Sequence, residues 1–344
     1  MIEPRTEIVL PGKPIIETIS FFRERLGLQL ESIMPAEEPR MAVLTGNGIR
    51  IVLDADHLGE PGLLQTRSSK PCDDLHAPNG TRIRYTAEPN QLVIPRPDDC
   101  AVVTNQTKAA AWTNGRAGML YRDLIPGRMS GHLIASHIRI PAGGPVADDV
   151  HFHDVRFQLI YCYRGWVRLV YEDQGEPFIL KSGDCVLQPP RIRHRVLESS
   201  DGLEVIEIAC PSSHLTTLDH QLTLPTNASR PNREFSGQRF HWHQHEHAKW
   251  QLDQATSWSS ACLGISEATK QMADATILRA AGDMQCTDTA LVFWFVVTGS
   301  CLIIIGSQTP SRLVAADCAT IPRNQPVSLE QCSEDLEILR IRLS

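Results

Sequence analysis

The chain has 344 residues, of which 42% are hydrophobic and 21% are charged, and its formal net charge is −7. This length predicts two or three domains, each with an ordinary hydrophobic core. The acidic balance and the lack of a basic tail argue against nucleic acid and against an anionic membrane as partners.

The N-terminal and cysteine patterns predict a cytoplasmic protein. The start, MIEPRTEIVLPGKP, does not combine a basic segment with an apolar stretch, so we expect no secretory signal. No window of 18 apolar residues predicts a transmembrane helix. The ten cysteines stand singly without a CxxC pair, and several, such as Cys162, lie in apolar runs. This pattern favours buried reduced thiols over a disulfide framework.

Residues 1–95 predict a small α+β module. The segment 14–28 has helical periodicity and ends at a glycine, with apolar residues at Ile15, Ile19, Phe22 and Leu26. Strand-like segments follow at 41–46, 49–54 and 82–88, the last after the turn HAPNGT. A strand, a helix and three strands are therefore expected.

This first module resembles one βαβββ module of the vicinal oxygen chelate (glyoxalase-like) superfamily. The segments that carry the resemblance are FFRERLGLQLE, IRIVLD and APNGTRIRYTAE. In that family two modules normally build one metal cup, and only one is visible here. Glu7 and Glu88 lie near the family's ligand positions, but no histidine accompanies them. The resemblance therefore implies a structural or dimerising module.

From about residue 118 to 222 the chain contains strand signals alone. They are HLIASHIRIP, FQLIYCY, WVRLVYED, PFILK, DCVLQPP and LEVIEIAC, separated by turns such as DQGEP and KSGD. Such closely spaced short strands predict an all-β sandwich or barrel over residues 96–225.

A linker and a second set of strands follow. The segment PTNASRPNREFSG, 225–237, is rich in turn-forming residues. The β pattern then repeats over 226–344, and superposing Gly165 on Gly299 aligns the two halves at an offset of 134 residues. We interpret this as an internal duplication.

The candidate chemistry lies in HFHDVRFQLIYCYRG, residues 151–165, which has the spacing H-x-H-x4-Q-x6-G. Alternate residues of a strand share a face, so His151 and His153 point the same way. A second segment at 183–198 has the spacing G-x5-P-x-R-x2-H-x3-E and contributes His194 from a neighbouring strand.

Together these segments resemble the two signature motifs of the cupin superfamily, G-x5-H-x-H-x3 or 4-E-x6-G and G-x5-P-x-G-x2-H-x3-N. Three substitutions depart from the pattern, namely Gln158 for Glu, Arg191 for Gly and Glu198 for Asn, and Gly144 lies one residue too early. The resemblance implies a mainly β fold class: two cupin (double-stranded β-helix, or jelly-roll) barrels preceded by the small α+β module.

The resemblance also implies a metal site formed by His151, His153 and His194. Gln158 stands where the family has a carboxylate ligand. It either ligates the metal through its neutral amide oxygen or hydrogen-bonds a substrate or a metal-bound water. Three imidazoles suit one divalent ion, with Fe(II) favoured and Mn, Ni or Zn as alternatives. Such a site keeps the full charge of the metal and should favour an anionic oxygen-donor substrate.

Four further residues are predicted to bind substrate. Arg156 and Arg193 lie close to the ligands in sequence, and strand alternation places Ile160 and Cys162 on the face of Gln158. The pocket should be apolar with few titratable groups, and Glu198 is a weak candidate for a general base.

Two other clusters are weaker candidates. In the second repeat Cys286 and Asp288 occupy the place of H-x-H, and its second motif has no histidine, so that barrel is predicted to be degenerate and structural. The alternating histidines of FHWHQHEHAKW predict a packing or solvated segment more than a metal site; they are His241, His243, His245 and His247.

The resulting hypothesis is a mononuclear non-haem dioxygenase for a small oxygen-chelating substrate, aromatic or diketone-like. A metal-dependent lyase, isomerase or hydrolase on the same barrel is one alternative, and a non-catalytic small-molecule-binding bicupin is another. We expect a homodimer whose partner is a small-molecule substrate.

Overall fold

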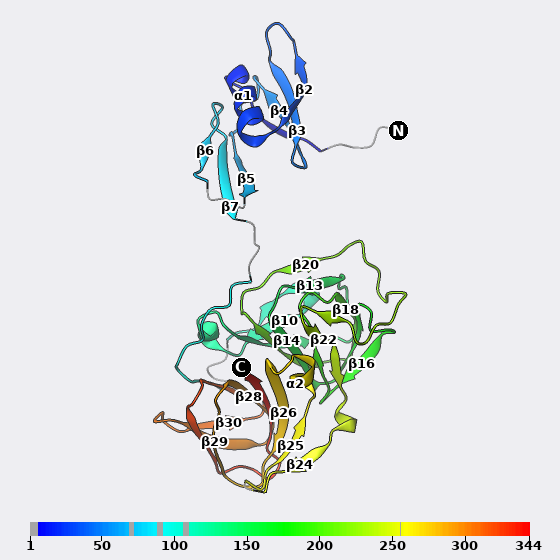
Figure 1. The fold of residues 1–344 in the computed structure, drawn as a ribbon, viewed down its shortest axis with the longest axis vertical. Helices are drawn as coiled ribbons and strands as arrows, with labels where there is room; N and C mark the ends of the chain where they lie inside the picture. The colour runs from blue at the N-terminus through cyan, green and yellow to red at the C-terminus, as the bar shows by residue number, and fades with distance from the viewer. Residues whose placement is uncertain (1–5, 69–71, 88–91, 106–109, 255) are drawn as a thin grey trace. The chain divides into compact units, whose positions relative to one another are not determined.

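The structure is a computed structural model that describes residues 6–68, 72–87, 92–105, 110–254 and 256–344. The chain divides into two units, Met1–Gln91 and Leu92–Ser344 (Figure 1). Among the described residues, no helix is long and apolar enough to cross a bilayer.

The smaller unit contains a four-stranded sheet and one helix. The sheet has the order β1-β4-β3-β2, and α1 packs on it. These elements are β1 (Ile8–Pro11), α1 (Ile15–Leu26), β2 (Gln29–Met34), β3 (Met41–Gly46) and β4 (Ile49–Asp54). The helix ends where Gly27 adopts a left-handed conformation, φ 65°, and its N–H donates to the Phe22 carbonyl. The predicted helix and the strands at 41–46 and 49–54 are thus confirmed.

A second sheet of this unit has the order β5-β7-β6. Its strands are β5 (Leu63–Ser68), β6 (Leu75–His76) and β7 (Arg82–Ala87). The strand predicted at 82–88 therefore lies in a separate sheet. The three strands that follow the helix in the main sheet are β2, which was not predicted, β3 and β4. Glu7 forms an ion pair with Arg50, while Glu88 lies outside the described residues. The glyoxalase-like origin of this module stays a prediction.

The first barrel of the larger unit consists of two facing sheets. One has the order β23-β17-β14-β19-β11-β10-β9 and the other β16-β15-β18-β13-β20, with β12 paired to β18. The strands are β9 (Thr113–Asn114), β10 (Leu120–Asp123), β11 (Ile134–Ile140), β12 (Gly144–Pro145), β13 (His151–His153), β14 (Phe157–Arg164), β15 (Trp166–Tyr171), β16 (Phe178–Lys181), β17 (Cys185–Leu187), β18 (His194–Ser199), β19 (Leu203–Cys210), β20 (Thr216–Leu218) and β23 (His241–His243).

The second barrel repeats this topology. Its sheets have the orders β24-β25-β26-β33-β28-β31-β8 and β27-β32-β29-β30. The strands are β8 (Val102–Thr104), β24 (Trp250–Leu252), β25 (Ser259–Cys262), β26 (Ala273–Arg279), β27 (Met284–Thr287), β28 (Leu291–Thr298), β29 (Ser300–Ile305), β30 (Ser311–Val314), β31 (Cys318–Ile321), β32 (Pro326–Glu330) and β33 (Glu337–Leu343). Gly165 and Gly299 follow β14 and β28 with φ of 76° and 74°, so the aligned glycines make equivalent turns.

Short elements lie between the strands of both barrels. They are the helices η1 (Arg116–Gly118), η2 (Pro126–Met129), η3 (His245–His247) and α2 (Ile265–Ala268) and the hairpin of β21 (Glu234–Phe235) with β22 (Gln238–Arg239). Each barrel also accepts an edge strand from beyond the predicted boundaries. β8 pairs with β31, and β23 pairs with β17. The predicted domain boundaries, between residues 95 and 96 and between residues 225 and 226, stay a prediction.

One hydrophobic core joins the two barrels. Alternate residues of β14 and β19, including Tyr161 and Ile208, pack against residues of β28 and β33 such as Phe295 and Ile341. The residues between them face the interior of the first barrel. Strand alternation therefore separates the side chains that stabilise the barrel pair from those available for a site.

Candidate metal centre

Three histidines converge inside the first barrel. His151 and His153 share one face of β13, and the register pairs His151 with His194 of β18. The ring centroids of His151 and His194 are 4.2 Å apart, and that of His153 is 5.2 Å from each. One ligand nitrogen from each ring lies within 4.8 Å of the other two. The structure thus brings together the three imidazoles that the motifs predict.

Hydrogen bonds orient each ring. Nδ1 of His151 lies 2.7 Å from the Asp149 carbonyl, and Nδ1 of His194 lies 3.0 Å from the Ile192 carbonyl. A carbonyl oxygen only accepts, so both Nδ1 atoms carry the proton and both Nε2 atoms keep a lone pair. Nδ1 of His153 contacts Thr216 Oγ1 at 2.8 Å. The Nε2 atoms are the nitrogens available to a metal.

Burial keeps the three rings neutral. Burial, with Arg116 as the next cause, lowers the pKa of His151 to about 4. Burial and then the neighbouring His151 lower the pKa of His153 to about 2. The pKa of His194 is also well below its usual value, because of burial and then of the other two rings. Neutral imidazoles are the form that binds metal, so no proton has to leave at neutral pH.

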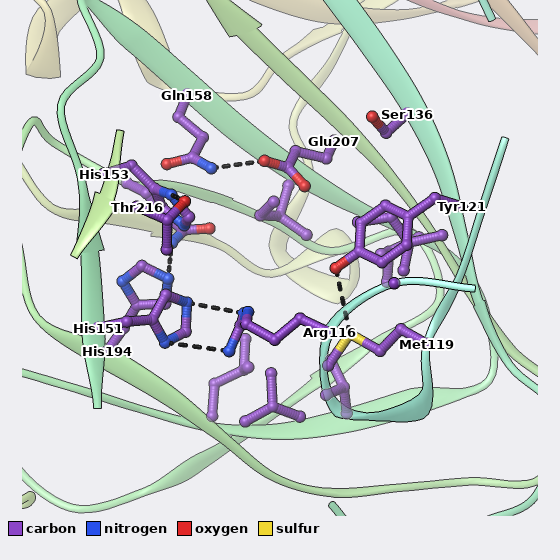
Figure 2. A pocket seen from close by; sticks show the side chains of 18 of the residues that line it. Arg116, Met119, Tyr121, Ser136, His151, His153, Gln158, His194, Glu207 and Thr216 are labelled. Atoms are coloured by element: carbon purple, nitrogen blue, oxygen red, sulfur yellow. Dashed lines mark hydrogen bonds between the residues drawn. The ribbon is translucent and has the colours of Figure 1, made fainter. Parts of the chain in front are cut away.

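Two side chains donate to the free nitrogens. Arg116 Nη2 lies 2.9 Å from His151 Nε2 (Figure 2), and Gln188 Nε2 lies 2.8 Å from His194 Nε2. Arg116 also forms an ion pair with Asp148, whose side chain is fully buried and whose other oxygen accepts the Val196 N–H. A metal on these nitrogens therefore has to displace both donors.

Gln158 lies deep in the same cavity with only 2% of its surface exposed. Its Nε2 donates to Glu207 Oε1 of the adjacent strand β19 at 2.6 Å. Among the described residues that line the cavity, Glu207 is the only Asp or Glu. The cavity thus holds a carboxylate close to the amide that replaces the family's acidic ligand.

The cavity has a volume of about 460 Å³. Its polar end carries the histidines, Gln158, Gln188, Arg116 and Glu207. Its walls are mostly aliphatic and aromatic, formed by Met119, Tyr121, Ile134, Ile138, Ile140, Ile160, Val167, Leu169, Tyr171, Val196, Leu203 and Val205. Burial and then Glu207 raise the pKa of Tyr121, so this phenol remains a neutral group. The space suits a small organic molecule with an apolar body and a polar end.

The donor set fits a divalent metal ion. His151, His153 and His194 present neutral nitrogens to one point from two paired strands, and each ring is held through its other nitrogen. Three imidazoles beside an open cavity are typical of catalytic rather than closed structural metal sites.

The four residues predicted to bind substrate lie in different places relative to the cavity. Ile160 lines the cavity, as strand alternation predicts. Cys162 faces the same interior but is packed into the core, with Sγ 3.5 Å from the Gly165 carbonyl. Arg156 contacts the Met272 sulfur, and Arg193 bonds Asp219 and stacks on Phe152, so neither lines the cavity. Both precede their strands, and proximity in sequence did not carry their side chains into the barrel.

Sequence reasoning missed the charged and hydrogen-bonding residues that surround the histidines. Arg116 enters from η1, Gln188 from the end of β17, Glu207 from β19, and His214 from the segment before β20. Only Glu207 carried a sequence signal, a charge inside the apolar strand LEVIEIAC. The expected base Glu198 pairs with Arg168 and is 42% exposed, whereas the carboxylate of the cavity is Glu207.

The two weaker clusters hold no comparable group among the described residues. Asp288 accepts from Arg342 at 2.6 and 2.9 Å, so it forms an ion pair inside the second barrel. The histidine-rich segment packs on the first barrel, where Trp242 stacks on Phe178 at 4.2 Å between ring centroids. These placements agree with a structural second barrel and a packing segment.

Comparison with known proteins gives the same fold. The family model of the AraC-like ligand binding domain matches residues 142–224. YlbA of E. coli, described as family-model DUF861, superposes with a TM-score of 0.52 at 7% identity over 74% of this chain and 95% of that chain. An oxalate decarboxylase mutant of Bacillus subtilis gives 0.52 at 13% identity over 74% and 78%.

The formate complex of Lactobacillus farciminis oxalate decarboxylase gives a TM-score of 0.52 at 13% identity over 74% of this chain and 88% of that chain. No curated protein sequence matches the chain significantly. At these identities the likenesses establish the fold alone. They confirm the predicted fold class, mainly β with two cupin barrels.

Proposed function

We propose that the protein is a metal-dependent cupin enzyme, a mononuclear non-haem dioxygenase for a small oxygen-chelating substrate of aromatic or diketone type. One observation carries the proposal: three neutral imidazole Nε2 atoms converge at the polar end of a cavity of about 460 Å³ with apolar walls. Fe(II) is the favoured ion, with Mn, Ni or Zn as alternatives.

The bound ion would supply redox chemistry with O2 and a Lewis acid for oxygen donors. His151, His153 and His194 would hold it. The aliphatic residues Ile138, Leu169 and Val205 would enclose the substrate body and exclude water from the polar end. Arg116, anchored by Asp148, would bind negative charge on the substrate.

We assign to Glu207 the role of holding a proton. It is the one carboxylate among the lining residues, and a substrate with an acidic hydroxyl or enol would lose a proton on binding as a chelating anion. Glu207 Oε2 is the atom we assign to receive that proton, since Oε1 accepts from Gln158. With this role for Glu207, the site would not need solvent to take up the proton of the substrate.

The same site supports a metal-dependent lyase, isomerase or hydrolase, and the fold likeness to oxalate decarboxylases favours keeping this candidate. The apolar walls argue against a substrate as small and uniformly polar as oxalate. A non-catalytic ligand-binding protein is a further candidate, because the AraC-like ligand binding model covers all three histidines. The homodimer and the cytosolic location stay predictions.

The test begins with metal content, measured by mass spectrometry on protein purified anaerobically without a histidine tag. We expect about one metal ion per chain, loss of the metal in His194→Ala, and a smaller loss in Gln158→Ala. Oxygen uptake is then measured with β-diketones and ortho-hydroxylated aromatic acids. Metal without oxygen uptake for any such substrate would favour the lyase or hydrolase candidate. A chain that stays metal-free after reconstitution would favour the binding protein.

A further inference from the structure

Gln158 and Glu207 form a closed pair on two neighbouring strands. Their strands are paired in the register Gln158↔Ala209 and Ile160↔Glu207, so both side chains face the interior diagonally across β14 and β19. The amide nitrogen lies 2.6 Å from the carboxylate oxygen, which is the range of a charge-assisted hydrogen bond.

This hydrogen bond determines which end of the amide faces the histidines. An ionised carboxylate only accepts, so the amide has to present its NH2 group to Glu207. The amide oxygen then lies on the opposite side, toward His153, as Figure 2 shows. The oxygen can ligate a cation, whereas the NH2 group cannot. Without a carboxylate partner, the glutamine amide could turn either its oxygen or its NH2 group toward the histidines.

Glu207 itself is not placed as a ligand. The ligand atoms of the three histidines lie within 4.8 Å of one another, and no carboxylate oxygen of Glu207 belongs to that group. We propose that Glu207 is a positioning residue that fixes the amide of Gln158 with its oxygen toward the metal. The pair thereby provides a neutral oxygen ligand backed by a negative charge, in place of a directly ligating carboxylate. This inference rests on the metal site of the proposed function.

The test is a double-mutant cycle read by Co(II) binding, with the visible absorption band of Co(II) as a signature of its ligands. Glu207→Gln keeps the size of the side chain but can donate as well as accept, so the amide orientation is released. We expect this variant to bind Co(II) about 10-fold or more weakly, the usual effect of losing an outer-shell partner. In a Gln158→Ala background the same change should have almost no further effect.

Two controls separate orientation from charge and folding. Glu204→Gln removes a carboxylate from the same strand outside the cavity lining, where Glu204 bonds His137, and should leave Co(II) affinity unchanged. The exchanged pair, Gln158→Glu with Glu207→Gln, keeps both the hydrogen bond and the total charge. It should bind Co(II) at least as tightly as the wild type, with an altered band. Thermal unfolding of each metal-free variant verifies the fold.

The outcomes distinguish the two proposals. If Glu207→Gln weakens Co(II) binding equally with and without Gln158, the carboxylate acts through its charge alone and the positioning role is wrong, while the metal site stands. If the wild-type chain binds no Co(II), the metal site and the positioning role both fall. A loss confined to chains that contain Gln158 supports the inference.

Discussion

The guanidinium of Arg116 forms a hydrogen bond with Nε2 of His151, the nitrogen that is available to a metal. Arg116 Nη2 donates to His151 Nε2 at 2.9 Å, and the residues of its loop include Ala117 and Gly118 with positive φ. Arg116 therefore competes with a metal twice, through the lone pair that it occupies and through its charge.

We expect Arg116→Met to raise the affinity for Co(II), because it removes the competing donor and the positive charge together. Isothermal titration with Co(II) measures the change. Arg116→Lys keeps the charge and serves as the matched control, with affinity close to the wild type. A lower affinity in Arg116→Met would instead indicate that Arg116 supports the predicted ligand His151.

His137 lies at the face between the two barrels and links folding to pH. Arg122 donates to its Nδ1 at 3.1 Å, its Nε2 lies 2.7 Å from Glu204, and its ring meets Phe295 edge-on. Burial lowers its pKa to about 4, and Glu204 opposes this shift. The folded protein thus keeps this ring neutral, while the unfolded chain takes up a proton near pH 6.5.

A lowered histidine pKa makes the protein less stable as the pH falls. Between about pH 6.5 and pH 4 the unfolded state binds the proton and the folded state does not. We expect His137→Gln to remove part of this acid sensitivity, up to about 3 kcal/mol of the difference between pH 7 and pH 4. Urea unfolding of both chains at several pH values measures it. Parallel curves for the two chains would contradict the shift.

At the scale of elements, β23 completes the edge of the first barrel. It pairs with β17, Trp242 stacks on Phe178, and the backbone N–H of His245 donates to Asp184 at 2.8 Å. The strand follows the linker but belongs to the barrel before it, so the histidine-rich segment has a packing role.

We expect Trp242→Ala to lower the free energy of unfolding by about 2 kcal/mol, less than for a fully buried tryptophan because Trp242 is half-buried. His247→Ala, at an exposed position of the same segment, should change it by less than about 0.5 kcal/mol. Denaturant titration compares the two. A marked loss of bound metal in His247→Ala would contradict the packing role.

At the scale of the whole molecule, the barrels share one core. Phe157, Tyr161 and Ile208 of the first barrel pack with Phe293, Phe295 and Ile341 of the second. Because removing either set would expose the other, we expect the two barrels to unfold together, and the unit of residues 1–91 to unfold separately.

Phe295→Ala tests this cooperativity in the full chain loaded with Co(II). It should cost about 3–5 kcal/mol, as for a buried phenylalanine, and lower the temperature at which the first barrel loses the Co(II) band. Calorimetry should show the transition of residues 1–91 unchanged. An unchanged Co(II) band, with only the second barrel destabilised, would show that the barrels unfold independently.

The sequence by itself determined the barrels and the three histidines. Strand alternation and fixed spacing are local rules: they put His151 and His153 on one face, Ile160 on the face of Gln158, and equivalent glycines after β14 and β28. A second motif at the right distance then supplied His194. The second repeat could also be recognised as degenerate from the sequence, because its aligned motif positions lack the histidines.

Only the tertiary structure decided what surrounds the histidines. Arg116 and His151 are 35 residues apart in the chain, and Gln158 and Glu207 are 49 apart. Such contacts depend on which strands pair, in which register, and where a loop enters the barrel, and no local pattern encodes these. Arg193 shows the converse, since it adjoins the predicted ligand His194 in sequence yet stacks on Phe152 outside the cavity lining.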